Sequence, residues 1–216
     1  MKRLYAKLLV NALLLTLIFN SSSFAGDATK WNLDKAHTSI NFMIMHILTP
    51  VHGKFEDFNI DLHFDPENLE ESSINVSIQV ASINTGWGPR DDHLKTADWF
   101  DADEYPVMSF NSSSIINKGG GNYIAKGKLK IKDVEKEIEL PFKLVGIKQI
   151  ISAEMKQMLG DVDEVASFEV SYSLNREEYN VGTGTSTPGS AAKVYSEVVG
   201  KEVGINIAIE VKRKAS

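Results

Sequence analysis

The side chains best suited to polar chemistry in this 216-residue chain are its five histidines and two of its arginines. Three converging imidazoles could hold zinc or a haem iron, but the chain has no HExxH or HxH spacing and no cysteine. His52 and His63 are flanked by alternating apolar residues, which indicates that they face solvent. We therefore predict no metal site and no cofactor, and a haem or metal carrier stays open as an alternative.

The two arginines and one of the remaining histidines have the chemistry of a site for an anionic group, such as the head group of an amphiphilic ligand. Arg90 and His93 are three residues apart, so they share one side of a helix. A guanidinium suits contacts with phosphate, and Arg176 in a later polar turn could join the pair. A solvated helix face is the plainer interpretation of such charges. These three residues are predicted head-group contacts.

Two further histidines are candidates for the same role. His46 shares the parity of the apolar residues that precede it, which predicts an inward position near a barrel end. There it is either a satisfied core residue or a head-group donor. His37 is either a head-group contact or a hydrogen-bond partner of Asp34 or Ser39.

Catalytic motifs are missing from the chain, which has no GxSxG elbow, no P-loop and no dinucleotide fingerprint. The run Gly182–Ser186 lacks the lysine and the helix that follow a phosphate loop. The sequence thus favours a protein that is not an enzyme and has no catalytic residues. A barrel enzyme acting on a small hydrophobic substrate stays an alternative, with His46 as its one inward titratable residue.

Bulky aromatic residues fall at the inward positions of the expected strands. Each by itself is best interpreted as core, but as a set they could line a long apolar tunnel, with Gly53 and Gly127 leaving room between them. Each lipid methylene buried there would contribute about 0.8 kcal/mol. The predicted lining residues are Phe42, Ile44, Phe55, Phe58, Trp99, Phe100, Phe110, Phe142 and Phe168.

The elements that position these residues are β-strands, because apolar and polar residues alternate with a period of two. The parity of the second strand changes across Glu56 and Asp57, where we expect a β-bulge. About eight strands of an all-β domain suffice to close a single antiparallel barrel, although a β-sandwich shows the same alternation. The expected strands cover 40–44, 51–64, 74–80, 107–115, 123–131, 138–144, 166–174 and 203–211.

Two segments interrupt the strands. Glycine and proline break the backbone between Asn84 and Pro106, where residues 90–100 are expected to form a short helical flap across one mouth, with its aromatic residues turned inward. Residues 148–159 place apolar side chains at helical spacing and end at Gly160, which predicts a small helical insertion.

Several motifs in the chain resemble the YceI-like polyisoprenoid-binding family. This resemblance implies a lipocalin-like antiparallel barrel that holds a long amphiphilic lipid, such as a polyisoprenoid or an isoprenoid quinone, in an apolar channel. Its match at Arg90 and His93 strengthens their head-group role. The motifs are Trp31-x-Leu33-Asp34-x-x-His37-Thr38-Ser39-Ile40-x-Phe42, Gly53-Lys54-Phe55, Arg90-Asp91-x-His93-Leu94-Lys95 and Trp99-Phe100-Asp101-Ala102 before Tyr105-Pro106.

The N-terminus has the three parts of a secretory signal peptide: early cations, an apolar run at 8–19 and the small-x-small site Ser23-Phe24-Ala25. We expect cleavage of residues 1–25, one lipid-binding domain at 26–216 and a periplasmic or secreted location. Without the three signal-peptide cations, 20 basic residues face 29 acidic ones, a net charge of −9. This charge argues against nucleic-acid partners; transient membrane contact and a homodimer stay open.

Overall fold

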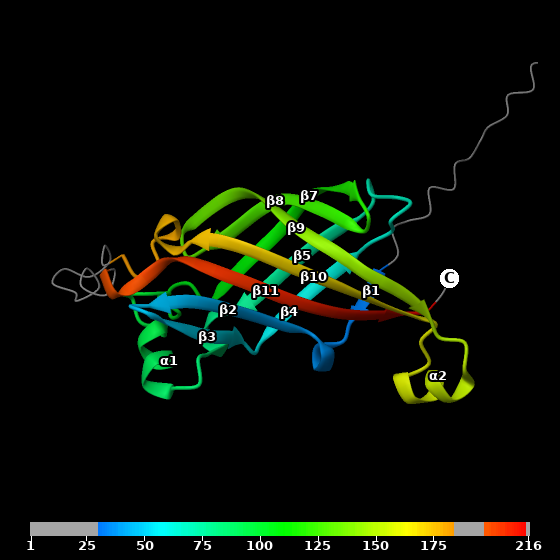
Figure 1. Cartoon of the computed structure of the whole chain (residues 1–216), viewed down its shortest axis with the longest axis horizontal. Helices are drawn as coiled ribbons and strands as arrows, with labels where there is room; N and C mark the ends of the chain where they lie inside the picture. Colours follow the sequence, from blue (N-terminus) through cyan, green and yellow to red (C-terminus); the bar gives the residue numbers. More distant parts are fainter. Residues whose placement is uncertain (1–29, 184–196, 215–216) are drawn as a thin grey trace, which may run out of the picture.

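The computed structural model describes residues 30–183 and 197–214, so the expected signal peptide and most of the polar loop after Gly182 lie outside the described residues. Within these ranges, eight strands close an antiparallel ring (Figure 1). They are β1 (Lys30–Leu33), β4 (Phe58–His63), β5 (Ser73–Gln79), β7 (Val107–Gly119), β8 (Asn122–Ile131), β9 (Val134–Gln149), β10 (Glu164–Asn175) and β11 (Val199–Arg213). Each pairs with the next, and β1 returns to β11. The predicted all-β antiparallel barrel is confirmed.

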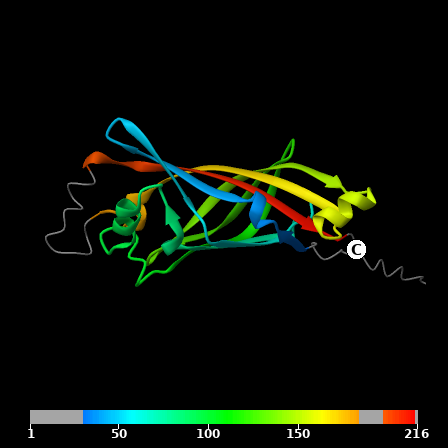
Figure 2. The same ribbon diagram turned by 90° about the horizontal axis from the view of Figure 1, so that it is seen from below.

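Three further strands prolong the wall at one end of the barrel. These strands, β2 (Ser39–His46), β3 (Thr49–Phe55) and β6 (Ile83–Asn84), continue the sheet from β11 in that order. The short turn η1 (Lys35–His37) separates β2 from β1, and η2 (Val80–Ser82) separates β6 from β5. The tip of the β2–β3 hairpin projects at that end (Figure 2).

The parity change predicted at Glu56 and Asp57 takes a different form in the structure. These two residues form a bend that divides β3 from β4, and not a β-bulge inside one strand. The bend is fixed by Glu56, whose backbone N–H donates to the carbonyl oxygen of Ser82 at 3.2 Å. Phe55 and Phe58 are both buried as a result, on opposite sides of the bend.

Two α-helices lie at opposite ends of the barrel (Figure 1). Helix α1 (Gly88–Lys95) has a proline in its first turn and lies beside the β2–β3 hairpin, where the flap was predicted. Helix α2 (Ala153–Leu159) is the predicted insertion. Ser152 caps α2, and Gly160 ends it with φ of 89°, a backbone conformation that glycine adopts without strain. None of the described helices is long and apolar enough to cross a membrane.

A solid aromatic core fills the half of the barrel that contains β1. Four rings, those of Phe64, Tyr123, Phe142 and Phe168, pack with centroids 5.2–6.2 Å apart. The indole Nε1 of Trp31 donates to the backbone oxygen of Phe64 at 2.9 Å, so the polar atom of this buried side chain is satisfied.

Candidate binding cavity

The other half of the barrel encloses a cavity of about 810 Å³, within the roughly 300–1,000 Å³ of ligand pockets. Its wall comes from the strands at that end and from residues 85–100, which cover it. Most of the wall is aliphatic or aromatic; central members are Val76, Leu129, Ile138, Leu140, Tyr172 and Ile205.

Position along a strand decides whether an inward side chain lines the cavity or joins the core. Ile138, Leu140 and Phe142 share one face of β9, because alternate residues of a strand point the same way. Ile138 and Leu140 line the cavity and are only half-buried, whereas Phe142 is 6% exposed in the aromatic core. Protein interiors normally fill such space, so this uncovered apolar wall is suited to a ligand.

The predicted lining residues divide between the two halves. Phe58, Phe142 and Phe168 are buried outside the cavity, with exposed fractions of 6%, 6% and 2%. Their rings pack against protein, so the predicted long tunnel is a cavity that occupies one half of the barrel. Those that line the cavity are Phe42, Ile44, Phe55, Trp99, Phe100 and Phe110.

The sequence interpretation omitted the aliphatic part of the wall. Leu129, Ile138 and Leu140 have the same parity as an inward aromatic residue of their strand, and Ile205 has the parity of Val203 and Ile207, which also line the cavity. Period-two alternation was therefore a sufficient signal for their direction, but the prediction was restricted to bulky rings.

The two glycines predicted to leave room serve close packing. A Cβ on Gly53 would lie 2.2 Å from Cζ of Phe42, so the absence of a side chain lets this ring rest on β3. A Cβ on Gly127 would lie 2.3 Å from the backbone oxygen of Asn111, beside a register shift between β7 and β8. Gly53 thus shapes the cavity wall, and Gly127 permits strand contact.

Four of the five predicted head-group residues line the cavity. Arg90 and His93 line it from α1, and His46 lines it from the end of β2. Arg90 is held by Thr85, which accepts from Nε at 2.7 Å and, through its backbone oxygen, from Nη2 at 2.8 Å. His46 is exposed, so it lies at the rim and not deep inside.

Arg176 also lines the cavity, but backbone oxygens already occupy its guanidinium, so it has a structural role in place of the predicted head-group contact. The side chain is 3% exposed, and its guanidinium lies 5.2 Å from the ring centroid of Trp99. Burial lowers the pKa of Arg176. Its N–H groups are occupied by four backbone oxygens, those of Val181 (2.6 Å), Gly182 (3.1 Å), Gly200 (2.9 Å) and Val199 (3.1 Å).

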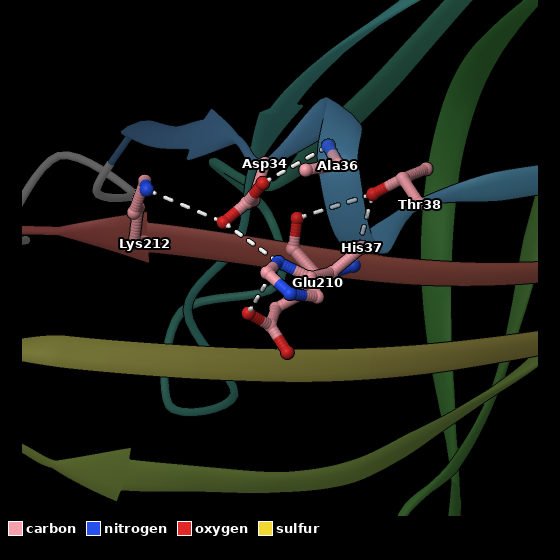
Figure 3. Close-up of polar contacts among 6 residues, drawn as sticks. All are labelled: Asp34, Ala36, His37, Thr38, Glu210 and Lys212. Carbon is pink, nitrogen blue, oxygen red and sulfur yellow. Dashed lines mark hydrogen bonds and ion pairs between the residues drawn. The ribbon is translucent and has the colours of Figure 1, made fainter. Parts of the chain in front are cut away.

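His37 lies on the outer wall, away from the cavity lining (Figure 3). Its Nδ1 is 3.2 Å from Oδ2 of Asp34 and 3.6 Å from Oε1 of Glu210, which agrees with the Asp34 alternative and corrects the head-group prediction. Lys212 Nζ is also 3.2 Å from Asp34 Oδ2. Asp34, His37 and Glu210 could supply three metal ligands, but Lys212 already neutralises Asp34. We therefore describe this group as an ion-pair network that joins η1 and its N-cap Asp34 to β11.

A comparison with known families identifies the chain. The YceI-like domain matches residues 31–211. The chain belongs to the YceI-like family. A UPF0312 protein of Photorhabdus laumondii is 32% identical over 165 residues, which cover 76% of this YceI-like chain and 81% of that protein. A UPF0312 protein of Vibrio campbellii is 33% identical over 126 residues, which cover 57% of this chain and 67% of that protein.

Solved YceI-like structures share the fold. BcnA of Burkholderia cenocepacia superposes with a TM-score of 0.67 at 27% identity, over 83% of this chain and 99% of BcnA. The YceI protein of Campylobacter jejuni gives 0.61 at 29% identity, over 85% and 98%. A polyisoprenoid binding domain from Saccharophagus degradans gives a TM-score of 0.59 over 85% of this chain and 98% of that domain. At 12% identity, this likeness shows a common fold alone.

YceI-like membership supplies no evidence for catalysis. An enzyme would need a titratable group inside the cavity with an orienting partner. His46 lies at the exposed rim. Tyr179, which lines the cavity, has its pKa raised to about 12 by burial and stays neutral at ordinary pH.

Proposed function

We propose that this protein is an exported, non-catalytic carrier of one long-chain amphiphilic lipid, a polyisoprenoid or an isoprenoid quinone. The observation that carries the proposal is the apolar cavity, whose inward residues, such as Leu129, Ile138 and Leu140, are left half-buried by the protein itself. A hydrocarbon chain would complete their burial, at about 0.8 kcal/mol for each methylene removed from water.

The cavity would orient such a lipid with its tail inward and its polar head at the mouth. The apolar wall leads toward the aromatic core, whereas the rim carries Arg90, His93 and His46. A phosphate or a quinone oxygen placed there would find a guanidinium or imidazole donor. Tail burial supplies affinity in this arrangement, and the rim supplies the preference for an amphiphile.

The proposed setting is the periplasm, where a lipid in transit between membranes needs shielding from water. The signal-peptide pattern at 1–25 supports export. The name of the Saccharophagus structure, a polyisoprenoid binding domain, agrees with an isoprenoid cargo. Transport, storage and protection during stress are the roles that a carrier of this kind would serve.

Titration with a short-chain isoprenoid quinone tests the proposal, because a quinone quenches nearby indole fluorescence and Trp99 lines the cavity. In Ile138→Asp an unpaired carboxylate faces the cavity, so affinity should fall at least about tenfold. Val145→Asp places the same charge on β9 at a 52% exposed position outside the cavity and should bind as the unaltered protein does. Saturable binding that a folded Ile138→Asp protein retains in full would overturn the proposal.

A further inference from the structure

The mouth of the cavity is rimmed by apolar side chains that no part of the described protein covers. The two-residue turn of the β2–β3 hairpin consists of Ile47 and Leu48, which are 64% and 87% exposed. Trp87, just before α1, is 60% exposed. His46 and Thr49, which flank the turn, line the cavity, as does Trp87. Ile47, Leu48 and Trp87, here called the lip, therefore surround the entrance.

The turn retains its apolar residues against the local backbone preference. Ile47 has φ of 54°, a left-handed conformation that is rare for a β-branched residue. Two-residue hairpin turns favour glycine, asparagine or aspartate at such positions. The backbone N–H of Ile47 donates to Val198 at 2.7 Å, which ties the tip to the start of β11. An exposed, strained, apolar tip at a cavity entrance is better explained by a contact with a partner than by folding.

We infer that the lip inserts into the surface of a lipid bilayer and that the cavity loads its ligand there; this inference rests on the proposed function. Tryptophan and aliphatic side chains are the residues that enter the bilayer interface, and a neighbouring arginine can stay at the phosphate level. Arg90 has its guanidinium 5.9 Å from the ring centroid of Trp87. A lipid could then pass from bilayer to cavity without crossing water.

The charge of the protein indicates which bilayer the lip would enter. The exported chain, without residues 1–25, would carry a formal net charge of −9, so a bilayer rich in anionic lipids would repel it. The inferred partner is a zwitterionic phospholipid surface, bound through apolar insertion. Binding should therefore change little with salt.

The opposite end of the molecule provides a natural control. Ile151 and Met158, beside and within α2, are 89% and 74% exposed and comparably apolar. Helix α2 lies at the end of the barrel opposite α1 (Figure 1), and neither residue lines the cavity. If any exposed apolar residue were enough for bilayer binding, both ends of the molecule would bind. The inference predicts that only the lip binds.

Flotation with vesicles of phosphatidylethanolamine and phosphatidylcholine tests the inference. Trp87 is the exposed member of three tryptophans, since Trp31 and Trp99 are 1% and 5% exposed. Vesicles should shift the fluorescence emission of Trp87 to shorter wavelength, and phospholipid brominated near the head group should quench that emission. Unchanged emission and no flotation would overturn the inference without any variant.

The decisive variant is Ile47→Asn with Leu48→Gly, which supplies favoured turn residues and removes the apolar tip. Vesicle binding and the rate of quinone transfer from vesicles should both fall at least about tenfold, while binding of detergent-dispersed quinone stays unchanged. Ile151→Asn with Met158→Ser should leave all three unchanged. Equal loss in both double variants, or retention in the first, would overturn the inference. Failure of the unaltered protein to bind dispersed quinone would instead overturn the proposed function.

Discussion

Phe42 and Gly53 show how single residues shape the cavity. The ring of Phe42 rests on the bare backbone of Gly53 and packs against Phe55, with ring centroids 5.6 Å apart. The sequence identified both aromatic residues and noted the glycine, since alternation predicts direction. The sequence analysis predicted that Gly53 leaves cavity space, whereas the ring of Phe42 fills that space. A sequence does not show which ring covers a glycine on the neighbouring strand.

Replacing Gly53 with alanine tests this contact. The new Cβ would lie 2.2 Å from Cζ of Phe42, so the ring must turn into the cavity. We expect the free energy of unfolding to fall by about 1–3 kcal/mol and quinone affinity to fall at least about threefold, as measured by urea denaturation and fluorescence titration. Gly146→Ala is the control, because no atom lies within 4 Å of its Cβ. Equal behaviour of the two variants would contradict this role.

Asp34 gives a pH-dependent prediction. Burial raises its pKa, but hydrogen bonds from His37, Lys212 and the backbone of Ala36 outweigh burial and lower the pKa below 3.8. A carboxyl whose pKa is lower when folded stabilises the protein above its unfolded pKa, and this contribution is lost as the pH falls through the folded pKa. Asp34→Asn should therefore destabilise the protein at neutral pH, with a deficit that shrinks in acid.

Urea denaturation between about pH 3 and 7 measures this deficit. Glu139→Gln is the matched control. That carboxylate also pairs with a lysine, Lys126, but it is 58% exposed, so its loss should leave the stability nearly unchanged at every pH. A constant deficit for Asp34→Asn across the whole range would show that its charge is not the cause.

At the scale of elements, Arg176 joins η3 (Arg176–Tyr179) to the start of β11. The sequence suggested an anion-binding residue, since an arginine in a polar turn usually faces solvent. The structure buries it against Trp99 and saturates it with backbone oxygens. These acceptors come from segments distant in sequence, so only the folded chain shows that the guanidinium is already engaged.

Arg176→Met should lower the free energy of unfolding by more than about 2 kcal/mol, because several buried carbonyls lose a charged donor. Lys201→Met is the control. It removes an ion pair with Glu177, but the Lys201 side chain is 61% exposed, so the free energy of unfolding should change by less than about 0.5 kcal/mol. Urea denaturation measures both. A folded Arg176→Met protein with unchanged stability and weaker binding of an anionic lipid would restore the head-group role.

At the scale of the whole molecule, the barrel is divided into a packed half and a hollow half. The strands and their inward faces, except β1 and β6, followed from period-two alternation. Glycine, proline and apolar spacing predicted helices at 90–100 and 148–159, and the structure has them at 88–95 and 153–159. The boundary between core and cavity did not follow from the alternation pattern. Phe110 lines the cavity and Phe142 packs beyond it, although both alternate in the same way, because depth along the barrel depends on which strands neighbour each other.

The exposed residues around α2 bear on assembly. Ile151 and Met158 lie at the packed end, away from the mouth, so a homodimer formed there would leave the cavity accessible. A homodimer stays a prediction, which sedimentation equilibrium of the unaltered protein and of Ile151→Asn measures.

Native mass spectrometry tests the central claim most directly. The protein would be expressed with its own N-terminus, purified from the periplasm without detergent, and weighed before and after organic extraction. We predict a mature chain that begins at residue 26 and carries one extractable isoprenoid lipid, with the added mass lost in Ile138→Asp and kept in Val145→Asp. A chain with no added mass that also takes up nothing from a total lipid extract would contradict the lipid-carrier function.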